Sequence, residues 1–253
     1  MNDHTIKILS DYSDDIDEIN IFKKNISGIL DLSRFTNLTK LNCSNNKIDE
    51  IINIPTTLKT LSCHTCKLTN LNNLPINLED LVCTHNSLRS LESLPPKLIT
   101  LFAHGCDLTI LNNLPDSLEV LVCSHNHISS LETLPSTLTS LDCQMNELTQ
   151  LDNLPINLET LVCSENKITN LNNLPNNLKT LECSYNLIDN LDNLPESLKC
   201  LICEHNKLTQ LDNLPRGLTR LECSWNPIKK LTNLPVGIVN KKNFIMCEKI
   251  AEI

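Results

Sequence analysis

The chain carries a repeat with a period of 20 residues, and this period constrains the fold more than any other feature of the sequence. Ten consecutive repeats fill residues 41–240 without an insertion or a deletion. Numbered from its first leucine as position 1, a repeat reads L-x-C-S-x-N-x-[LI]-x-x-L-x-N-L-P-x-x-L-x-x. A single repeat has no enclosed interior, so the repeats have to stack and bury their apolar positions against each other.

Each repeat combines a short strand, a turn and a return segment. The strand is predicted from the alternation of leucine, a variable residue and cysteine, for example from Leu158 to Cys163. The asparagine at position 6, such as Asn166, follows the strand where the chain turns, and its amide can bond backbone groups of the turn and of the next repeat. The proline at position 15 favours extended or polyproline-like backbone on the return segment. The prediction is an α/β-type repeat solenoid that is mostly β.

The repeat resembles that of the leucine-rich repeat family. The family signature L-x-x-L-x-L-x-x-[NC]-x-L is matched by Leu158, Leu161, Cys163, Asn166 and Ile168. The 20-residue length and the L-P-x-x-L-x-x-L element resemble the short class of bacterial secreted effectors of the Yop M and Ipa H type. The C-S-x-N variant is also similar to repeat proteins of giant amoebal viruses such as mimivirus. The resemblance implies an arc with a parallel β-sheet on its concave face, an extended convex side, and the binding of other proteins on the concave face.

The two ends of the chain depart from the period. Residues 1–40 are interpreted as an N-terminal cap with one divergent repeat, and residues 241–253 as a C-terminal cap over the last of the ten repeats in 41–240. The acidic residues between positions 3 and 18 favour a solvated polar cap, with an acidic docking tail as the alternative. Six residues form the pattern of the divergent repeat: Asn25, Ile26, Ile29, Leu32, Phe35 and Leu38.

Nine of the 13 cysteines stand at position 3 of a repeat, and Ala103 fills the tenth place. We expect them in the core, because a buried cysteine behaves as a small hydrophobe. A row of thiols at the ~4.8 Å strand spacing cannot surround one metal ion tetrahedrally, and adjacent disulfides would be strained. Cys66 and Cys106 replace the turn asparagine, whereas Cys200 and Cys247 are the better candidates for a reactive thiol. The set predicts a reducing compartment, the cytoplasm, which is that of a host if the effector or viral resemblance holds.

The variable positions 2, 4 and 5 are expected to face outward and to form a partner-binding surface. Position 2 is apolar in three consecutive repeats and lies beside several histidines, which fits the centre of a protein interface. Toward the C-terminus the face becomes acidic, with two aromatic residues as candidate anchors. The alternative is that β-branched residues stand there for sheet propensity alone. The predicted partner-binding residues are Val82, Phe102, Val122, His85, His104, His125, Tyr185, Ile202 and Trp225.

Composition and motifs exclude several function classes. With 21 Lys and Arg against 30 Asp and Glu, and aromatic residues at 3%, the chain is a poor binder of nucleic acid. No apolar run approaches the ~20 residues of a membrane span, and residues 1–17 lack the apolar stretch of a signal peptide. A glycine-rich phosphate loop, a nucleophile elbow and an H-E-x-x-H motif are all missing, so we expect neither an enzyme nor a cofactor.

These observations predict a non-catalytic module that binds a partner protein on the concave face, and the effector-like resemblance implies a host protein. The alternative is a structural or self-assembling protein with the apolar residues buried in a homodimer, so the chain is expected to be a monomer or a homodimer. The histidines could bind a transition metal or make binding pH-sensitive. A metal site is disfavoured because side chains at positions 4 and 5 are expected to point in different directions, so that these histidines would not converge on one ion.

Overall fold

The computed structural model describes residues 1–229, 231 and 233–239. The chain divides into two compact units, Met1–His127 and Ile128–Ile253, and each is described by itself. The predicted C-terminal cap at 241–253, with Cys247, lies outside the described residues. The boundaries expected at 40/41 and 240/241 stay predictions.

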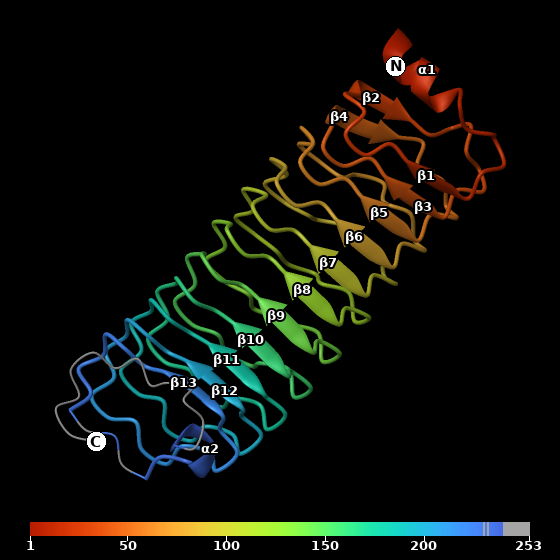
Figure 1. Cartoon of the computed structure of the whole chain (residues 1–253). Helices are drawn as coiled ribbons and strands as arrows, with labels where there is room; N and C mark the ends of the chain where they lie inside the picture. The colour runs from red at the N-terminus through yellow and green to blue at the C-terminus, as the bar shows by residue number, and fades with distance from the viewer. Residues whose placement is uncertain (230, 232, 240–253) are drawn as a thin grey trace. The chain divides into compact units, whose positions relative to one another are not determined.

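The first unit consists of a short helix followed by stacked parallel strands (Figure 1). Helix α1 spans Asp3–Leu9. A second, smaller parallel pair joins the segments that follow β1 and β3, namely β2 (Ser27–Asp31) and β4 (Lys47–Ile52). The main strands, each paired in parallel with the next, are β1 (Glu18–Asn20), β3 (Lys40–Asn42), β5 (Thr60–Ser62), β6 (Asp80–Val82), β7 (Thr100–Phe102) and β8 (Val120–Val122).

The second unit repeats this arrangement with five parallel strands and a terminal helical turn, α2 (Val236–Val239). Its strands are β9 (Ser140–Asp142), β10 (Thr160–Val162), β11 (Thr180–Glu182), β12 (Cys200–Ile202) and β13 (Arg220–Glu222). The prediction of a mostly-β repeat solenoid with a parallel sheet is confirmed.

The strands of the main sheets are only three residues long, yet the backbone ladder continues beyond them. β10 is shorter than the strand predicted from Leu158 to Cys163. The N–H of Cys163 nevertheless donates to the carbonyl of Glu182 at 2.8 Å, and the N–H of Glu165 donates to the carbonyl of Ser184 at 2.8 Å. Successive repeats are therefore tied through positions 3 and 5 as well as through the strand.

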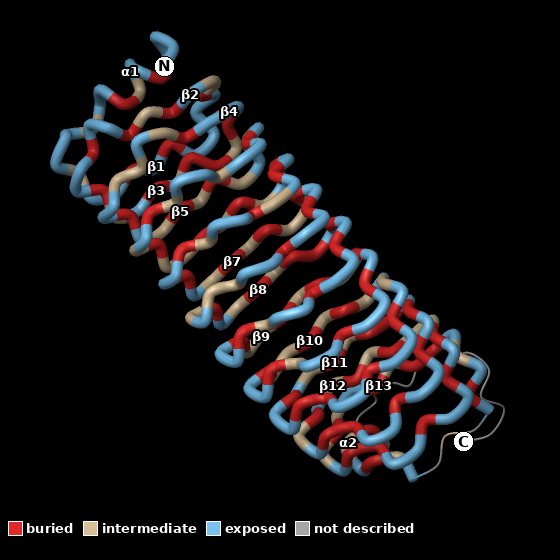
Figure 2. The backbone as a smooth tube through the Cα atoms, turned by 180° about the vertical axis from the view of Figure 1, so that it is seen from behind, coloured by how far each residue is buried: buried red, intermediate tan, exposed pale blue. Residues whose placement is uncertain are grey.

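The core of each unit consists of apolar positions that recur in every repeat. The strand leucine at position 1 is buried between two half-buried neighbours, as at Leu161 in β10. All nine position-3 cysteines are buried, as predicted, and Ala103 is buried in the tenth place. Figure 2 shows buried residues recurring at equivalent places in successive coils of each unit.

The asparagine at position 6 satisfies the backbone of the turn. In Asn86, the side-chain N–H₂ donates to the carbonyls of Cys63 at 2.9 Å and Cys83 at 2.8 Å, while Oδ1 accepts from the N–H of Leu68 at 3.0 Å. The prediction that this amide bonds the next repeat was wrong, because Cys63 and Leu68 belong to the preceding one. One buried side chain thus pairs backbone groups that would otherwise have no partner in the interior.

The return segment turns at each proline. The N–H of Leu78 donates to the carbonyl of Pro75 at 3.0 Å, and the same bond recurs from Pro55 to Pro235. Proline suits this place because it needs no donor and fixes φ at the start of a turn. Leu78 is thereby brought back into the core, where it is fully buried.

Candidate functional site

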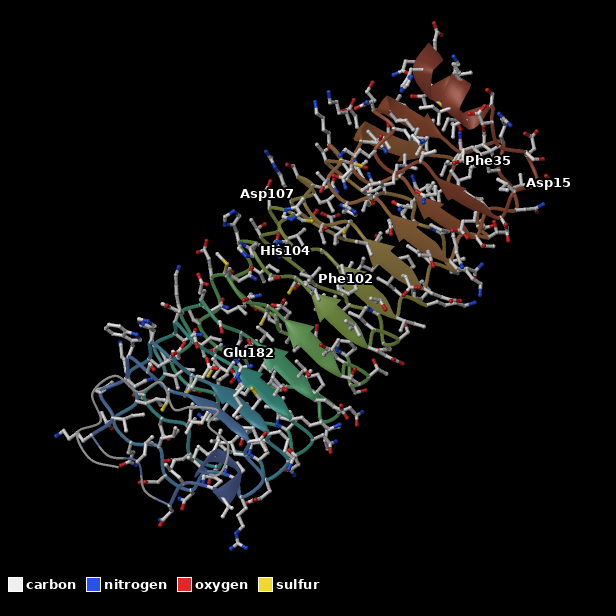
Figure 3. All side chains as sticks on the ribbon, viewed as in Figure 1. Asp15, Phe35, Phe102, His104, Asp107 and Glu182 are labelled. Carbon is white, nitrogen blue, oxygen red and sulfur yellow. The ribbon has the colours of Figure 1, made fainter. Side chains whose placement is uncertain are left out.

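The apolar strip consists of Val82, Phe102 and Val122, on consecutive strands of the first unit. Val82 lies opposite Phe102, and Phe102 lies opposite Val122, in parallel register. All three residues are half-buried, whereas the leucine that precedes each is buried. Figure 3 shows Phe102 on β7. The structure therefore brings these three predicted residues together on the face of the sheet.

The histidine cluster consists of His85, His104 and His125. The rings of His85 and His104 lie 4.9 Å apart between centroids, and those of His104 and His125 lie 4.5 Å apart, both edge to face. Nδ1 of His104 lies 2.9 Å from the hydroxyl of Ser124. A position-4 ring thus lies between two position-5 rings, although the position-4 residue is half-buried and the two position-5 residues are exposed.

Gly105 provides the space for this cluster. It holds the position-5 site of the repeat that contains His104, with φ of +60°. A Cβ atom there would lie 3.0 Å from Nδ1 of His85. Nearby, burial and then the neighbouring His85 lower the pKa of His64 below its ordinary value. Even so, no group of three or more His, Cys, Asp or Glu side chains within the described residues is placed to hold a metal ion.

The aromatic stack consists of Tyr185, His205 and Trp225, at position 5 of three consecutive repeats of the second unit. The centroids of Tyr185 and His205 are 4.1 Å apart with 15° between the ring planes, and those of His205 and Trp225 are 5.1 Å apart with 11°. Tyr185 is 53% exposed and Trp225 62% exposed. His205 was not among the predicted site residues, although its 20-residue spacing from both partners was a signal that could have found it.

Position 5 has a left-handed backbone in every repeat, with φ between +50° and +60°. This region is comfortable for glycine and asparagine but costs most other residues about 1–2 kcal/mol. The residues there are Asn45, Thr65, His85, Gly105, His125, Met145, Glu165, Tyr185, His205 and Trp225. Asn45, Gly105 and the three histidines are of types enriched in this region, whereas the other five residues do not follow the backbone preference.

Several position-4 serines lie inside rather than on the variable face. Ser44, Ser124, Ser184 and Ser224 are buried, which corrects the expectation that this position faces outward. The Ser184 hydroxyl accepts from the N–H of Glu204 at 3.0 Å, and the Ser44 hydroxyl accepts from the N–H of His64 at 3.2 Å. A small hydroxyl beside the backbone of the next repeat thus joins two rungs of the stack.

The face of the second unit is acidic around Ile202. Ile202 is half-buried and lies opposite Glu182 on β11 and Glu222 on β13. Figure 3 shows Glu182 on β11. The guanidinium of Arg220 forms an ion pair with Glu222 at 2.8 Å, and this contact raises the pKa of Arg220. The parallel register therefore places two carboxylates of this acidic face on either side of Ile202.

The thiols do not support the reactivity predicted for Cys200. Burial raises the pKa of Cys200, which disfavours the reactive thiolate. The pKa of Cys66 and of Cys106 is lowered instead, first by a hydrogen bond with the thiol of Cys43 and of Cys83, respectively. The Cys106 thiol also donates to the carbonyl of Cys83 at 3.1 Å, which places it in the structural role of the turn asparagine.

A hollow of about 550 Å³ lies between return segments of the first unit, and Glu92 is the one titratable side chain in its lining. Neither α1 nor α2, the helices of the described residues, is long and apolar enough to cross a membrane.

No protein-family model matches the sequence, and no curated protein matches it, whereas solved structures do. YopM from Yersinia enterocolitica is 30% identical over 88% of this chain and 52% of its own, with a TM-score of 0.78. YopM from Yersinia pestis, described as a leucine-rich effector protein, is 30% identical over 88% of this chain and 67% of its own, with a TM-score of 0.76.

The functional domain of InlJ from Listeria monocytogenes, described as including a cysteine ladder, is 28% identical over 84% of this chain, with a TM-score of 0.73. The chain spans 59% of that structure's length and about half of the Y. enterocolitica YopM. The row of buried position-3 cysteines in this chain is comparable to the ladder named for InlJ. The chain belongs to the leucine-rich repeat family, in the short class of the bacterial effectors.

Proposed function

We propose that the chain is a non-catalytic module that binds a partner protein on the strand face of its repeats. The observation that carries this proposal is the apolar strip of Val82, Phe102 and Val122, which lies in register across three strands. At the ~4.8 Å strand spacing, the three side chains form one continuous apolar surface. An aromatic residue flanked by aliphatic ones in such a surface is typical of the centre of a protein interface.

The division between constant and variable positions supports this function. Leucine, cysteine and asparagine repeat at the buried positions and hold the coil, as Leu121, Cys123 and Asn126 show by their burial. The half-buried position 2 varies between polar, acidic and apolar side chains. A regular scaffold with variation confined to one face can change its partner without changing its fold.

We also propose that the partner is a host protein and that the chain acts in a reducing compartment, the cytoplasm. The similarity to the Yersinia effector YopM supports the first part. The second part is supported by the twelve cysteines of the described residues, all of which are free thiols. The resemblance to giant-virus repeat proteins stays a prediction.

The test is affinity capture from host cytosol with the wild-type chain and with Phe102→Asp. A charge in the middle of the apolar strip should reduce capture about 30-fold, because a central anchor contributes ~2 kcal/mol or more. Val236→Asp is the matched control, since Val236 is exposed and belongs to α2 rather than to a strand. Undiminished capture by Phe102→Asp, with the fold intact by circular dichroism, would contradict the proposal.

Self-assembly through the same strip is the competing function. Light scattering at micromolar concentration separates the two, because a homodimer that Phe102→Asp converts to a monomer would favour self-assembly. A wild-type monomer favours a separate partner.

A further inference from the structure

The aromatic stack ends at Tyr185, and the next position-5 residue beyond this ring carries a carboxylate. Tyr185 contacts the ring of His205 on one side, and no other ring of the described residues contacts it. The next position-5 residue on its open side is Glu165, one repeat earlier in the ladder. The N–H of Glu165 donates to the carbonyl of Ser184 at 2.8 Å, so its backbone is fixed against the repeat that carries Tyr185.

Four positions of the repeat give the strand face of the second unit an excess of negative charge, whereas position 7 of its turns carries Lys167, paired with Glu147, and Lys207. Positions 2, 4, 5 and 20 of the second unit's strands and turns carry five carboxylates but only one guanidinium. The carboxylates belong to Asp142, Glu165, Glu182, Glu204 and Glu222, and the guanidinium belongs to Arg220. Arg220 is already paired with Glu222. Within the described part of the chain, the carboxylates of Glu165, Glu182 and Glu204 form neither an ion pair nor a side-chain hydrogen bond. A cationic group would complement this surface.

We propose that the second unit binds an arginine-containing, extended basic segment of a partner protein, with one guanidinium stacked on the open face of Tyr185 and paired with Glu165. The inference rests on the proposed protein-binding function and specifies the chemistry of the partner. A guanidinium is planar, weakly hydrated and suited both to stacking on an aromatic face and to pairing with a carboxylate.

The geometry of the stack favours this ligand. Tyr185 and His205 lie 4.1 Å apart and are nearly parallel, so the row already holds flat groups at the spacing of the repeats. A guanidinium on the open face of Tyr185 continues the row by one member and reaches the level of Glu165. Further basic residues of an extended segment would meet Glu182 and Glu204, which belong to the neighbouring rungs.

Single-stranded nucleic acid could also use exposed rings, since bases stack on aromatic side chains. Its phosphates, however, would face the carboxylates of this surface, and phosphate contacts supply most of the affinity of such complexes. A basic peptide is therefore the ligand that the charge and the rings favour together.

The experiment titrates the full chain with a fluorescently labelled 12-residue peptide of alternating arginine and serine, followed by anisotropy at low salt. Tyr185→Asn removes the ring but keeps a residue that the same backbone position accepts at Asn45, and should weaken binding about fivefold. Glu165→Gln should weaken binding about threefold, at the upper end for an exposed ion pair. Glu196→Gln changes the same charge on an exposed return residue and should leave binding unchanged. Replacing arginine by lysine in the peptide should weaken binding to the wild-type chain. It should also reduce the difference in peptide affinity between wild type and Tyr185→Asn.

Equal binding by wild type and Tyr185→Asn would overturn the inference, as would tighter, Tyr185-dependent binding of an oligothymidine of 12 nucleotides. Self-association that is lost in Tyr185→Asn would assign the stack to a second copy of the chain and would also overturn it. Phe102→Asp should bind the peptide normally. Two results can therefore be told apart. If Phe102→Asp captures as much partner as wild type while wild type binds the peptide through Tyr185, the proposed function fails and this inference stands. If Tyr185→Asn binds the peptide as tightly as wild type while Phe102→Asp loses capture, this inference fails and the proposed function stands.

Discussion

Raising the pH from 8 to 10 should destabilise the fold through the stacked cysteines. Burial raises the pKa of Cys183 to about 12, whereas a thiol of the unfolded chain titrates near ~8.5. Because the folded pKa is raised, the stabilisation is complete below the unfolded pKa and is lost as the pH rises toward the folded one. The window for Cys183 therefore runs from about pH 8.5 to about 12.

The expected loss is measurable against the stability of a folded protein. For one thiol that stays protonated in the folded chain, ionisation of the unfolded chain lowers the free energy of unfolding by ~0.2 kcal/mol at pH 8 and ~2 kcal/mol at pH 10. Two more stacked thiols, Cys63 and Cys163, have a pKa raised first by burial and act in the same direction. The lowered pKa of Cys66 and Cys106 acts in the opposite direction. A typical domain has only ~5–15 kcal/mol in total, so the loss at Cys183 alone is a measurable fraction of the stability.

The assay is urea denaturation followed by circular dichroism at pH 7, 8, 9 and 10 under reducing conditions, for wild type and Cys183→Ala. Alanine is accepted in this row, as Ala103 shows by its complete burial. The cavity left by the sulfur costs the variant the same at every pH, so the stability advantage of wild type should shrink by ~2 kcal/mol between pH 8 and pH 10. A difference that is independent of pH would refute the reasoning.

Cys66 provides a control of opposite sign. The hydrogen bond with Cys43 lowers the pKa of Cys66, so its stabilisation is present above the unfolded pKa and is lost as the pH falls through the folded pKa. The advantage of wild type over Cys66→Ser should therefore grow from pH 7 to pH 10. The same trend for both variants would show that the two thiols share one environment, contrary to the structure.

Three further substitutions test the coil. Asn86→Ala should lower the free energy of unfolding by ~3 kcal/mol or more, because two buried carbonyls and one N–H lose their partner; a loss under ~1 kcal/mol in urea titration would contradict this role. Thr65→Asn should stabilise the chain by ~1 kcal/mol in the same assay, since threonine at φ of +53° is replaced by a residue suited to that region, and a destabilised variant would argue against backbone strain. Gly105→Ala should separate the rings of His85 and His104, because the new Cβ would lie 3.0 Å from Nδ1 of His85; unchanged ring shifts in NMR spectra would disprove the contact.

Most of the fold was predictable because the same constraint is repeated ten times. Leu161 and Cys163 were expected inside, and their burial follows from a period that places every equivalent residue in the same register. The direction of the asparagine bonds was not predictable, since Asn86 stands midway between two repeats that offer the same backbone groups. The position-4 serines were missed for a related reason. A serine hydroxyl after a strand can bond either to solvent or to a backbone N–H. The sequence pattern is the same in both cases, and in the structure the Ser44 and Ser184 hydroxyls accept from backbone N–H groups.

The candidate site was predicted residue by residue but not as an arrangement. Val82, Phe102 and Val122 share one position, so their alignment follows from the period alone. The contact of His104 with His85 and His125 does not, because it depends on the left-handed backbone at position 5 and on the missing side chain of Gly105. Residues such as threonine, methionine and tryptophan rarely adopt that backbone, so nothing in their identity indicates it.

The left-handed row explains how one chain combines a uniform scaffold with a variable surface. At position 5, the N–H of Tyr185 donates to the carbonyl of Glu204 at 2.9 Å, and that of His205 donates to the carbonyl of Ser224 at 3.0 Å, so the ladder between rungs imposes φ whatever the side chain is. The backbone cost is then ~1–2 kcal/mol at each rung for most residue types. Ring contacts of ~0.5–1.5 kcal/mol per pair offset much of it where Tyr185, His205 and Trp225 stand together. Stability alone would fill this row with asparagine and glycine, as at Asn45 and Gly105. The exposed rings in their place are consistent with the binding proposed above, which predicts that replacing them affects binding far more than folding.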